Sequence, residues 1–324
     1  MSKMSTDALR RHALNGPAMG SRWSALFFAP AAVDPAPIRA ALQAALDEVE
    51  EEMSTWRPDS ALMRLNRAPV GAWVALPPGL ARVLALALRI GRASDGAFDI
   101  AMGDAVRAWG FGPDAADPQA IRAALDAPRQ PAHALLDLEG DRLRKRAPCQ
   151  LDLNGIAKGH GVDRLAEVLA DHGIAAALVG IDGEMRALGL RPDGSPWTLA
   201  VEAPDPARRA PQAILALQDA AVATSGDYRH WVTVQGRRLS HTMDPRRGAP
   251  LPAPPASVSV VAPLCAEADA WATALMVAGP LHGPELARRA GLDALFLLRA
   301  ADGALRSKPV GPLFAGRQGA PTEV

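Results

Sequence analysis

The stretch Asp152-Leu-Asn-Gly-Ile-Ala-Lys-Gly-His-Gly161, followed by Val162-Asp163, stands where a predicted strand at 150–153 gives way to a predicted helix at about 155–172. Glycines at such a junction let a ligand approach the backbone closely. The free N–H groups at the helix start favour an anion, and Lys158 adds a positive charge. The stretch is not a Walker loop, because the order GxxxxGK[ST] is absent. Taken alone, it fits a structural turn as well as a phosphate cradle.

The segments on either side of this junction mix helical and extended patterns. Apolar residues at helical spacing predict further helices at about 37–54, 78–94 and 264–277. Short apolar runs between turn residues predict strands. These strands are 21–28, 135–138, 142–146, 176–181, 197–202, 214–217, 231–234, 239–243, 257–261 and 294–298. Strands and hairpins with unevenly placed helices favour an α+β fold over a regular doubly wound sheet.

Composition narrows the class of protein. The chain has 324 residues, 49% of them hydrophobic and 22% charged, which is ordinary globular composition. The formal net charge is zero, so nothing indicates bulk attraction to nucleic acid or to an anionic membrane. An anionic ligand must therefore be held locally, by a few placed donors or by a metal. Cys149 and Cys265 lie outside any CxxC pattern, which excludes a disulfide scaffold and a thiolate zinc site.

The sequence shows no pattern typical of a transmembrane helix or a signal peptide. No apolar run reaches the ~18 residues that a transmembrane helix needs. Residues 1–23 contain an Arg10-Arg11 pair but neither the apolar core of a signal peptide nor a lipobox. We therefore expect a cytoplasmic protein as the sequence is written, or a periplasmic one if the N-terminus has been trimmed.

Three further segments combine ionisable residues with turn or helix-start positions. Asp269 and Thr273 are four apart on one helical face, and their oxygens are the hard ligands that Mg²⁺ prefers; an ordinary helix start fits them too. His241 and Asp244 end a predicted strand, where a core histidine and a turn aspartate are the plain alternatives. The run 223–228, Ala-Thr-Ser-Gly-Asp-Tyr, places polar residues after an apolar strand.

Other enzyme classes fail on their motifs. The chain has no HExxH helix, no GxSxG elbow and no GxGxxG after a strand. The seven histidines do not cluster at metal-binding spacing.

Taken together and in this order, the segments resemble the ApbE family, the FAD:protein FMN transferases. The resemblance covers about residues 17 to 300. It is carried by Met19-Gly20-Ser21, Ser54-Thr55-Trp56 with Asp59-Ser60, Asp95–Asp99 with Trp109–Phe111, Asp152–Asp163, Ile181–Glu184, Ala223–Tyr228, His241–Gly248, and Ala268-Asp269 with Thr273. Two departures are Ser21, where the family usually has threonine, and Ala272, where some members have a further acid.

The resemblance implies a fold and a site. The fold would be a T-fold-like α+β arrangement of mostly antiparallel or mixed sheets with flanking helices. A single domain would span 17–324, after a flexible N-terminal extension at 1–16. The implied Mg²⁺ ligands are the backbone carbonyl of Gly155 and the side chains of Asp269 and Thr273. The implied FAD-binding residues are Met19, Trp56, Ala97, Phe98, Asp99, Asp152, Lys158 and Met243.

The resemblance also implies an activity: Mg²⁺-dependent transfer of FMN from FAD to a threonine hydroxyl of an acceptor protein, with AMP leaving. His241 is the first candidate for the base that takes the threonine proton, because a histidine pKa lies near operating pH. Asp244 and Asp269 are the other candidates. Two rival functions stay open, an FAD pyrophosphatase that gives FMN and AMP, and a flavin-binding protein without turnover.

Overall fold

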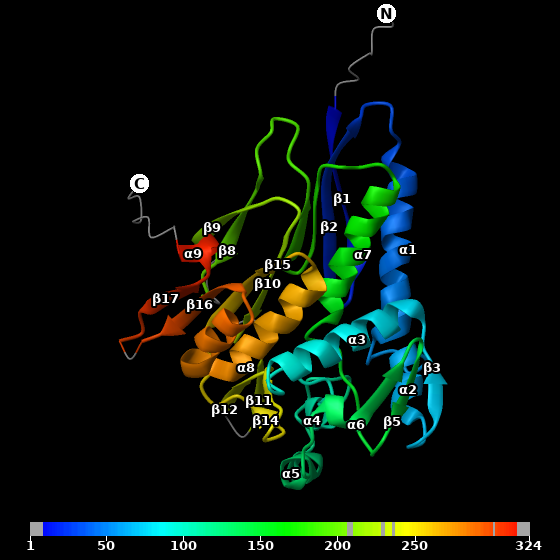
Figure 1. Cartoon of the computed structure of the whole chain (residues 1–324), viewed down its shortest axis with the longest axis vertical. Coiled ribbons are helices and arrows are strands. Elements are labelled where there is room, and N and C mark those ends of the chain that lie inside the picture. Colours follow the sequence, from blue (N-terminus) through cyan, green and yellow to red (C-terminus); the bar gives the residue numbers. More distant parts are fainter. Residues whose placement is uncertain (1–8, 206–209, 228–230, 235–236, 301, 316–324) are drawn as a thin grey trace, which may run out of the picture.

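An eight-stranded sheet forms the centre of the molecule (Figure 1). The computed structural model describes residues 9–205, 210–227, 231–234, 237–300 and 302–315. The strands, in spatial order, are β1 (Leu9–Ala18), β2 (Ser21–Pro30), β6 (Ala177–Ile181), β7 (Glu184–Leu188), β10 (Ala221–Gly226), β15 (Ser257–Ala262), β16 (Asp293–Arg299) and β17 (Leu305–Val310). Each neighbouring pair in this sheet is antiparallel. Together with the flanking helices, this confirms the α+β prediction.

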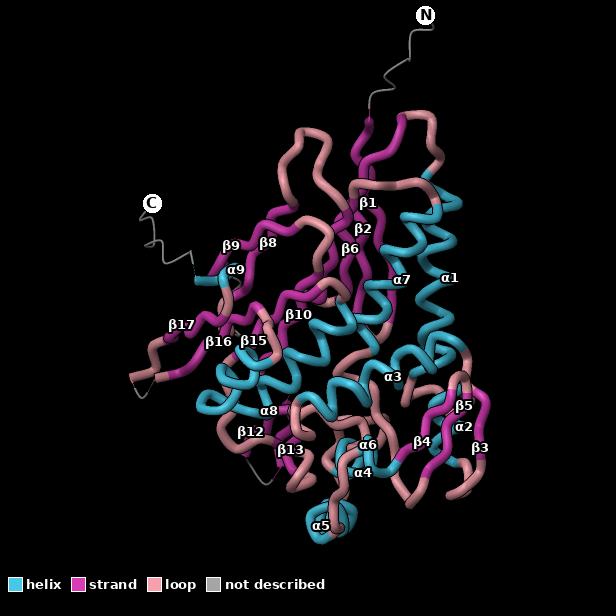
Figure 2. Tube along the Cα trace, viewed as in Figure 1, coloured by secondary structure: helices cyan, strands magenta, loops and turns pink. Residues whose placement is uncertain are grey.

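Long helices cover one face of the sheet, as Figure 2 shows in cyan against the magenta strands. They are α1 (Pro35–Met53), α7 (Ala157–Asp171) and α8 (Cys265–Arg289). Helix α1 follows Asp34, whose side chain accepts a hydrogen bond from the N–H of Ala36 and so satisfies one free donor of the first turn. Its Leu42 and Leu46 are fully buried with Val162 and Leu165 of α7. The helical spacing of these leucines is what the sequence pattern detected.

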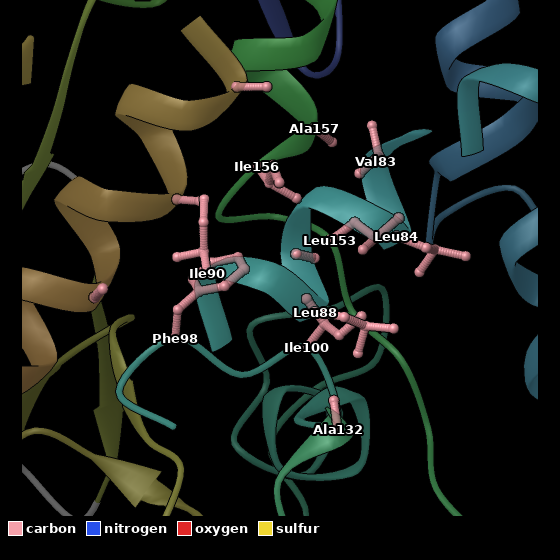
Figure 3. Close-up of a cluster of buried hydrophobic side chains, with 14 of the residues drawn as sticks. Val83, Leu84, Leu88, Ile90, Phe98, Ile100, Ala132, Leu153, Ile156 and Ala157 are labelled. Atoms are coloured by element: carbon pink, nitrogen blue, oxygen red, sulfur yellow. The ribbon is translucent and has the colours of Figure 1, made fainter. Parts of the chain in front are cut away.

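A second group of elements lies beyond the ends of these helices. It contains α3 (Pro78–Ala93) and a three-stranded sheet of β3 (Trp73–Ala75), β5 (Arg142–Lys145) and β4 (Leu136–Glu139). The short helices are α2 (Ala61–Arg67), α4 (Gly103–Ala108), α5 (Pro118–Asp126) and α6 (Ala132–Leu135). Figure 3 shows how Leu84 and Leu88 of α3 share one buried cluster with Leu153 and Ile156. This core therefore supports the segment that leads into α7.

The opposite face of the large sheet carries a hairpin of β8 (Trp197–Glu202) and β9 (Pro211–Leu217). Successive side chains of a strand point to opposite faces of the sheet, and two neighbouring residues of β16 show this. Phe296 belongs to the core that contains α8, whereas Leu297 is buried with Trp197 of the hairpin. The remaining elements are β11 (Trp231–Val234), β12 (Arg237–Ser240), β13 (Met243–Asp244), β14 (Ala249–Pro250) and α9 (Pro312–Ala315).

The prediction of a strand at 150–153 was wrong, and the reason is local. The side chain of Asn66 accepts a hydrogen bond from the N–H of Leu151 at 2.7 Å and donates one to its carbonyl at 2.9 Å. On this edge a side-chain amide takes the place of a neighbouring strand, while on the other edge Gln150 and Asp152 make single backbone hydrogen bonds with Gly103 and Ile100. The extended, buried sequence pattern is real, but a strand ladder does not form there.

The first part of the chain also differs from expectation. Residues 9–16, expected in a flexible extension, form the start of β1 and pair with β2 from Leu9–Pro30 to Gly16–Trp23. Residues 1–8 lie outside the described part. Helix α8 runs past its predicted end at 277. Gly279, with a φ of 75°, interrupts it just before Pro280, and the helix then resumes and ends at Arg289. Within the described residues, no helix is both long and apolar enough to cross a membrane.

Candidate active site

One cavity of about 1270 Å³ gathers the segments that the sequence singled out. Its walls come from the β1–β2 turn, the end of α1, the α3–α4 connection, the start of α7, the β6–β7 turn, β8, β10, residues 241–245 and α8. All but one of the predicted site residues line it. They are Met19, Trp56, Ala97, Phe98, Asp99, Asp152, Gly155, Lys158, His241, Met243, Asp269 and Thr273. The exception is Asp244.

Helices α7 and α8 hold the centre of this site by capping each other. Asp163 of α7 accepts hydrogen bonds from the N–H groups of Cys265 and Ala266 at 2.9 Å each, at the start of α8. Asp269 of α8 accepts one from the N–H of Gly159 at 3.0 Å, in the first turn of α7. Carboxylates are favourable at both positions, since a helix N-terminus carries a partial positive charge.

Gly159 allows the two helices to meet this closely. A Cβ atom at this position would lie 2.4 Å from the carbonyl oxygen of Cys265 and 2.7 Å from Cα of Ala266. Only a residue without a side chain fits there. From the sequence, this glycine-rich stretch fitted a structural turn as well as a phosphate cradle, and at Gly159 the glycine serves a helix–helix contact.

Asp269 is buried, with 5% of its surface exposed. Burial, with the nearby charge of Glu184, raises the pKa of this carboxyl above its ordinary value, against the opposing effects of Lys158 and the Gly159 N–H. Only Oδ2 is engaged by the N–H of Gly159, and no described residue hydrogen-bonds to Oδ1. A buried carboxylate of this kind gains most from a cation placed against its second oxygen.

Thr273 and Gly155 lie together beside Asp269. A Cβ atom on Gly155 would be 3.1 Å from Oγ1 of Thr273 and 3.2 Å from the ring of Phe98, so the backbone of Gly155 runs close to the threonine. Oγ1 of Thr273 is also 3.1 Å from Oγ of Ser225. Carboxylate, hydroxyl and backbone carbonyl form a set of hard oxygen donors that suits Mg²⁺. Among the described residues no group of three His, Cys, Asp or Glu side chains could hold a metal, so a cation here would rely on this mixed set.

Lys158, the positive charge expected at the helix start, lines the cavity and is paired with carboxylates. Its Nζ lies 2.8 Å from Oε1 of Glu184 and 3.5 Å from Oδ2 of Asp182. Burial lowers the pKa of Lys158, but Glu184 and Asp269 raise it by more, so the ammonium stays charged. Oε2 of Glu184 is buried without a hydrogen-bond partner in the described part of the chain.

Among the described residues, this end of the cavity gathers carboxylates around one ammonium. Asp182 and Glu184 lie 3.5 and 2.8 Å from Nζ of Lys158, and the charge of Asp269 also acts on that ammonium. A polyanionic ligand would meet repulsion here unless a further cation came with it. The ion pairs join residues far apart in sequence, which is why the motif 181–184 was noticed without a role for Glu184.

Two predicted flavin-site aspartates have different surroundings. Asp152 accepts a hydrogen bond from the N–H of Asn154 at 2.9 Å, and burial raises its pKa to about 6. Asp99 accepts from the N–H groups of Ala101 and Ala132 at 2.8 and 3.1 Å. Its contacts hold the loop that carries Phe98, so a positioning role suits Asp99 better than ligand contact.

The aromatic residues near the cavity also differ in whether their rings are exposed to it. Trp56 is 63% exposed where it lines the cavity, so its ring is available to a planar ligand. Phe98 is buried against Gly155. Trp109 does not line the cavity; its indole N–H donates to the carbonyl of Gly248 at 2.9 Å, and its ring packs beside Met243. Trp109 therefore has a packing role and no place in the cavity wall.

Of the two predicted catalytic residues near the end of β12, His241 and Asp244, only His241 lines the cavity. His241 and Met243 line the cavity. Asp244 instead closes a turn, because Oδ1 accepts from the N–H of Arg246 and its carbonyl accepts from the N–H of Gly248, both at 2.9 Å. Tyr228, which ended the polar run 223–228, lies outside the described residues.

An antiparallel sheet and two mutually capped helices beside a large cavity with an acidic end are what an α+β ligand-binding protein needs, and comparison identifies the family. The model of the ApbE family matches residues 19–296. An FAD:protein FMN transferase of Vibrio cholerae is 37% identical over 294 residues, covering 90% of this chain and 88% of the relative. That of Escherichia coli K12 is 34% identical over 304 residues, covering 92% and 87%. The chain belongs to the ApbE family.

Solved structures agree with this assignment. The flavin transferase ApbE from Vibrio cholerae superposes with a TM-score of 0.83 at 33% identity, covering 94% of this chain and 98% of that one. The apo flavinyl transferase ApbE of Pseudomonas stutzeri gives a TM-score of 0.82 at 35% identity, covering 95% and 96%.

Proposed function

We propose that this protein transfers FMN from FAD to a threonine hydroxyl of an acceptor protein in a Mg²⁺-dependent reaction that releases AMP. Relatives at 34–37% identity carry the name FAD:protein FMN transferase. The observation that carries the proposal is the meeting of Gly155, Asp269 and Thr273 at one acidic end of a cavity of about 1270 Å³. Pockets for small ligands typically measure about 300–1000 Å³, so this cavity is large for a small-molecule site.

The reaction balances as a phosphoryl transfer. The threonine oxygen forms a bond to the FMN phosphorus, the bond from this phosphorus to the bridging oxygen breaks, and AMP leaves with the electron pair. Bound at Gly155, Asp269 and Thr273, Mg²⁺ supplies charge neutralisation for the pyrophosphate and the leaving group. The chain itself contributes the fixed ammonium of Lys158 and a carboxylate oriented by the Gly159 N–H.

The threonine proton needs an acceptor. Of the three candidates, His241 lines the cavity, Asp244 is used in a turn, and Asp269 is the proposed cation ligand. We therefore assign the base to His241. A histidine in this role has a pKa suited to proton transfer near neutral pH.

The test is a mass measurement on purified components. The protein is incubated with FAD, Mg²⁺ and an acceptor domain that carries the threonine motif, and intact masses of both chains are recorded. We expect an FMN-sized gain on the acceptor that is lost with EDTA or when the acceptor threonine is changed to alanine. AMP and free FMN without an adduct on any of several acceptors would instead indicate a pyrophosphatase. Intact FAD throughout would indicate a flavin-binding protein.

A further inference from the structure

The turn between β1 and β2 places a methionine in a backbone conformation that this residue rarely adopts. Met19 and Gly20 connect the two strands, and their φ angles are 51° and 72°. The residues on either side, Ala18 and Ser21, pair with each other. Two-residue hairpin turns with positive φ at both positions favour asparagine or aspartate before the glycine, because these residues tolerate the left-handed region. Methionine lacks this tolerance, so the turn is strained at Met19.

Met19 is the exception among the residues other than glycine that have a positive φ in the described part of the chain. The other three are Asp95, Asp182 and Asp219. Aspartate enters the left-handed region more readily, because its short polar side chain can form local hydrogen bonds. Strain of this kind persists only where the surrounding structure fixes it, and it gathers at functional sites. Met19 therefore needs a partner that holds it in place.

Glu50 of α1 is this partner. Its Oε1 accepts a hydrogen bond from the backbone N–H of Met19 at 2.5 Å, across 31 residues of sequence. A carboxylate acceptor makes such a bond roughly twice as strong as one between neutral groups. Glu50 and Met19 both line the active-site cavity, so this contact lies in the cavity wall. The carboxylate thus fixes the turn at the point where it borders the cavity.

The side chain of Met19 lies beside the start of α7. A Cβ atom on Gly161 would be 3.3 Å from Sδ of Met19, so the thioether rests against the backbone of this glycine. Met19 also packs against two hydrophobic cores, the one that contains α3 and the one that contains β2. A thioether makes favourable contacts with aromatic rings. The turn therefore offers a fixed, polarisable group to a ligand with aromatic rings, as FAD has.

Resting on the proposed function, we infer that Glu50 is a positioning residue for FAD. Its carboxylate holds the Met19 backbone in the left-handed conformation, and this conformation sets the place of the Met19 side chain in the cavity wall. Glu50 acts on the ligand through the turn and not through its own charge. Without Glu50, the turn would relax toward a conformation that methionine prefers, and the thioether would leave its place against Gly161.

Two variants matched in charge test this role. Glu50→Ala removes the acceptor, and Glu48→Ala removes a carboxylate two residues earlier on α1. Glu48 pairs with Arg164 at 3.3 Å and lies outside the cavity wall. We expect Glu50→Ala to raise the Kd of FAD about tenfold, the effect of one hydrogen bond to a charged group, and Glu48→Ala to leave it unchanged. Titration of flavin fluorescence with Mg²⁺ and no acceptor protein measures the Kd. Equal Kd values for the two variants would overturn the proposal.

A conservative variant separates positioning from charge. Glu50→Gln keeps an oxygen that can accept from the N–H of Met19 but removes the negative charge. Positioning predicts a Kd for FAD within about threefold of that of the unchanged protein, since a neutral hydrogen bond keeps roughly half of the effect of a charged one. A Kd as high as that of Glu50→Ala would show that the charge itself acts on the ligand, against the proposal.

A double variant tests the link between Glu50 and the turn. Glycine adopts the left-handed region freely, so a Met19→Gly turn needs no partner to hold it. On that background Glu50→Ala should leave the Kd of FAD unchanged, whereas the same rise on both backgrounds would show that Glu50 acts independently of Met19. Because the glycine turn is unstrained, this comparison holds even where Glu50→Ala alone does not fold.

The two proposals fail differently in these experiments. Equal FAD binding by the unchanged protein, Glu50→Ala and Glu48→Ala removes the role of Glu50 and leaves the transferase activity standing, which the mass measurement on the acceptor decides. No FAD binding by the unchanged protein removes the transferase activity, and the role of Glu50 with it.

Discussion

At the scale of single residues, Asp269 does two things with one carboxylate. One oxygen completes the first turn of α7, and the proposed function gives the same carboxylate a second role as a ligand of Mg²⁺ in the cavity that it lines. The sequence could suggest the second role from the spacing to Thr273. It could not suggest the first, since the partner amide lies 110 residues away.

We expect Asp269→Ala to lower Mg²⁺-dependent turnover by at least about a hundredfold, because a metal ion contributes several kcal/mol of charge stabilisation. The control is Glu267→Ala on the same helix. Glu267 pairs with Arg89 at 3.5 Å on the surface, where an ion pair contributes little. Turnover of FAD at varied Mg²⁺ is the measurement. Equal activity of the two variants would remove Asp269 from the metal site.

His160 gives a prediction about acid stability. Burial, aided by the positive charges of Arg82 and Arg164, lowers its pKa to about 4. Below the ordinary histidine pKa of about 6.5 the unfolded chain takes up a proton that the folded chain refuses. The free energy of unfolding should therefore fall by up to about 3 kcal/mol between pH 6.5 and 4 through this residue.

Urea unfolding at several pH values measures this loss. A His160→Asn variant lacks the titrating group, so its stability should depend less on pH in that window. The same pH slope in both proteins would show that other groups cause the acid sensitivity.

At the scale of elements, the close contact of α7 with α8 depends on Gly159. Alanine is the better helix former by about 1 kcal/mol, so Gly159→Ala would stabilise an isolated helix. In the folded chain its Cβ would collide with the backbone at Cys265 and Ala266, and we expect a net loss of about 1–3 kcal/mol. Because Asp269 would shift with α8, Mg²⁺ should also bind more weakly. Denaturant unfolding that shows a gain in stability would contradict this account.

Elements also show where sequence reasoning succeeds and where it stops. Residues 78–93 form a helix because one apolar face repeats at helical spacing, and this is legible in the sequence. The ten residues of β1 show no alternation of apolar and polar types in the sequence. Their strand forms because β2 lies beside them, which is tertiary information. At 150–153 the sequence indicates an extended, buried segment, which is present, but no strand ladder forms. The side-chain amide of Asn66 takes the hydrogen bonds of Leu151 that a neighbouring strand would make. Short motifs located the cavity residues, whereas the ion pairs of Lys158 could not be deduced from them.

At the scale of the whole molecule, ligand and cation should depend on each other. The chain is neutral overall, yet the cavity end around Lys158 is acidic. FAD at a hundred times its Kd stabilises a protein that binds it only when folded by about 2.7 kcal/mol. For a chain of this size that corresponds to a rise in Tm of roughly 5 °C.

We expect this rise with Mg²⁺ present and little of it in EDTA, because the pyrophosphate would then lie against the carboxylates around Lys158 without a cation of its own. Differential scanning fluorimetry without an acceptor protein measures it. An equal rise under both conditions would show that FAD binds without the cation.

The mutual capping of α7 and α8 has a consequence for how the protein folds. Each helix start is completed by a carboxylate from the other helix, Asp163 in one direction and Asp269 in the other. Neither end can be satisfied before the two have met, so the pair should open and close as one cooperative unit in native-state hydrogen exchange. The proposed metal ligand then exists in its working position only in chains that have completed this step, and Mg²⁺ would act as a late ligand that selects correctly folded molecules.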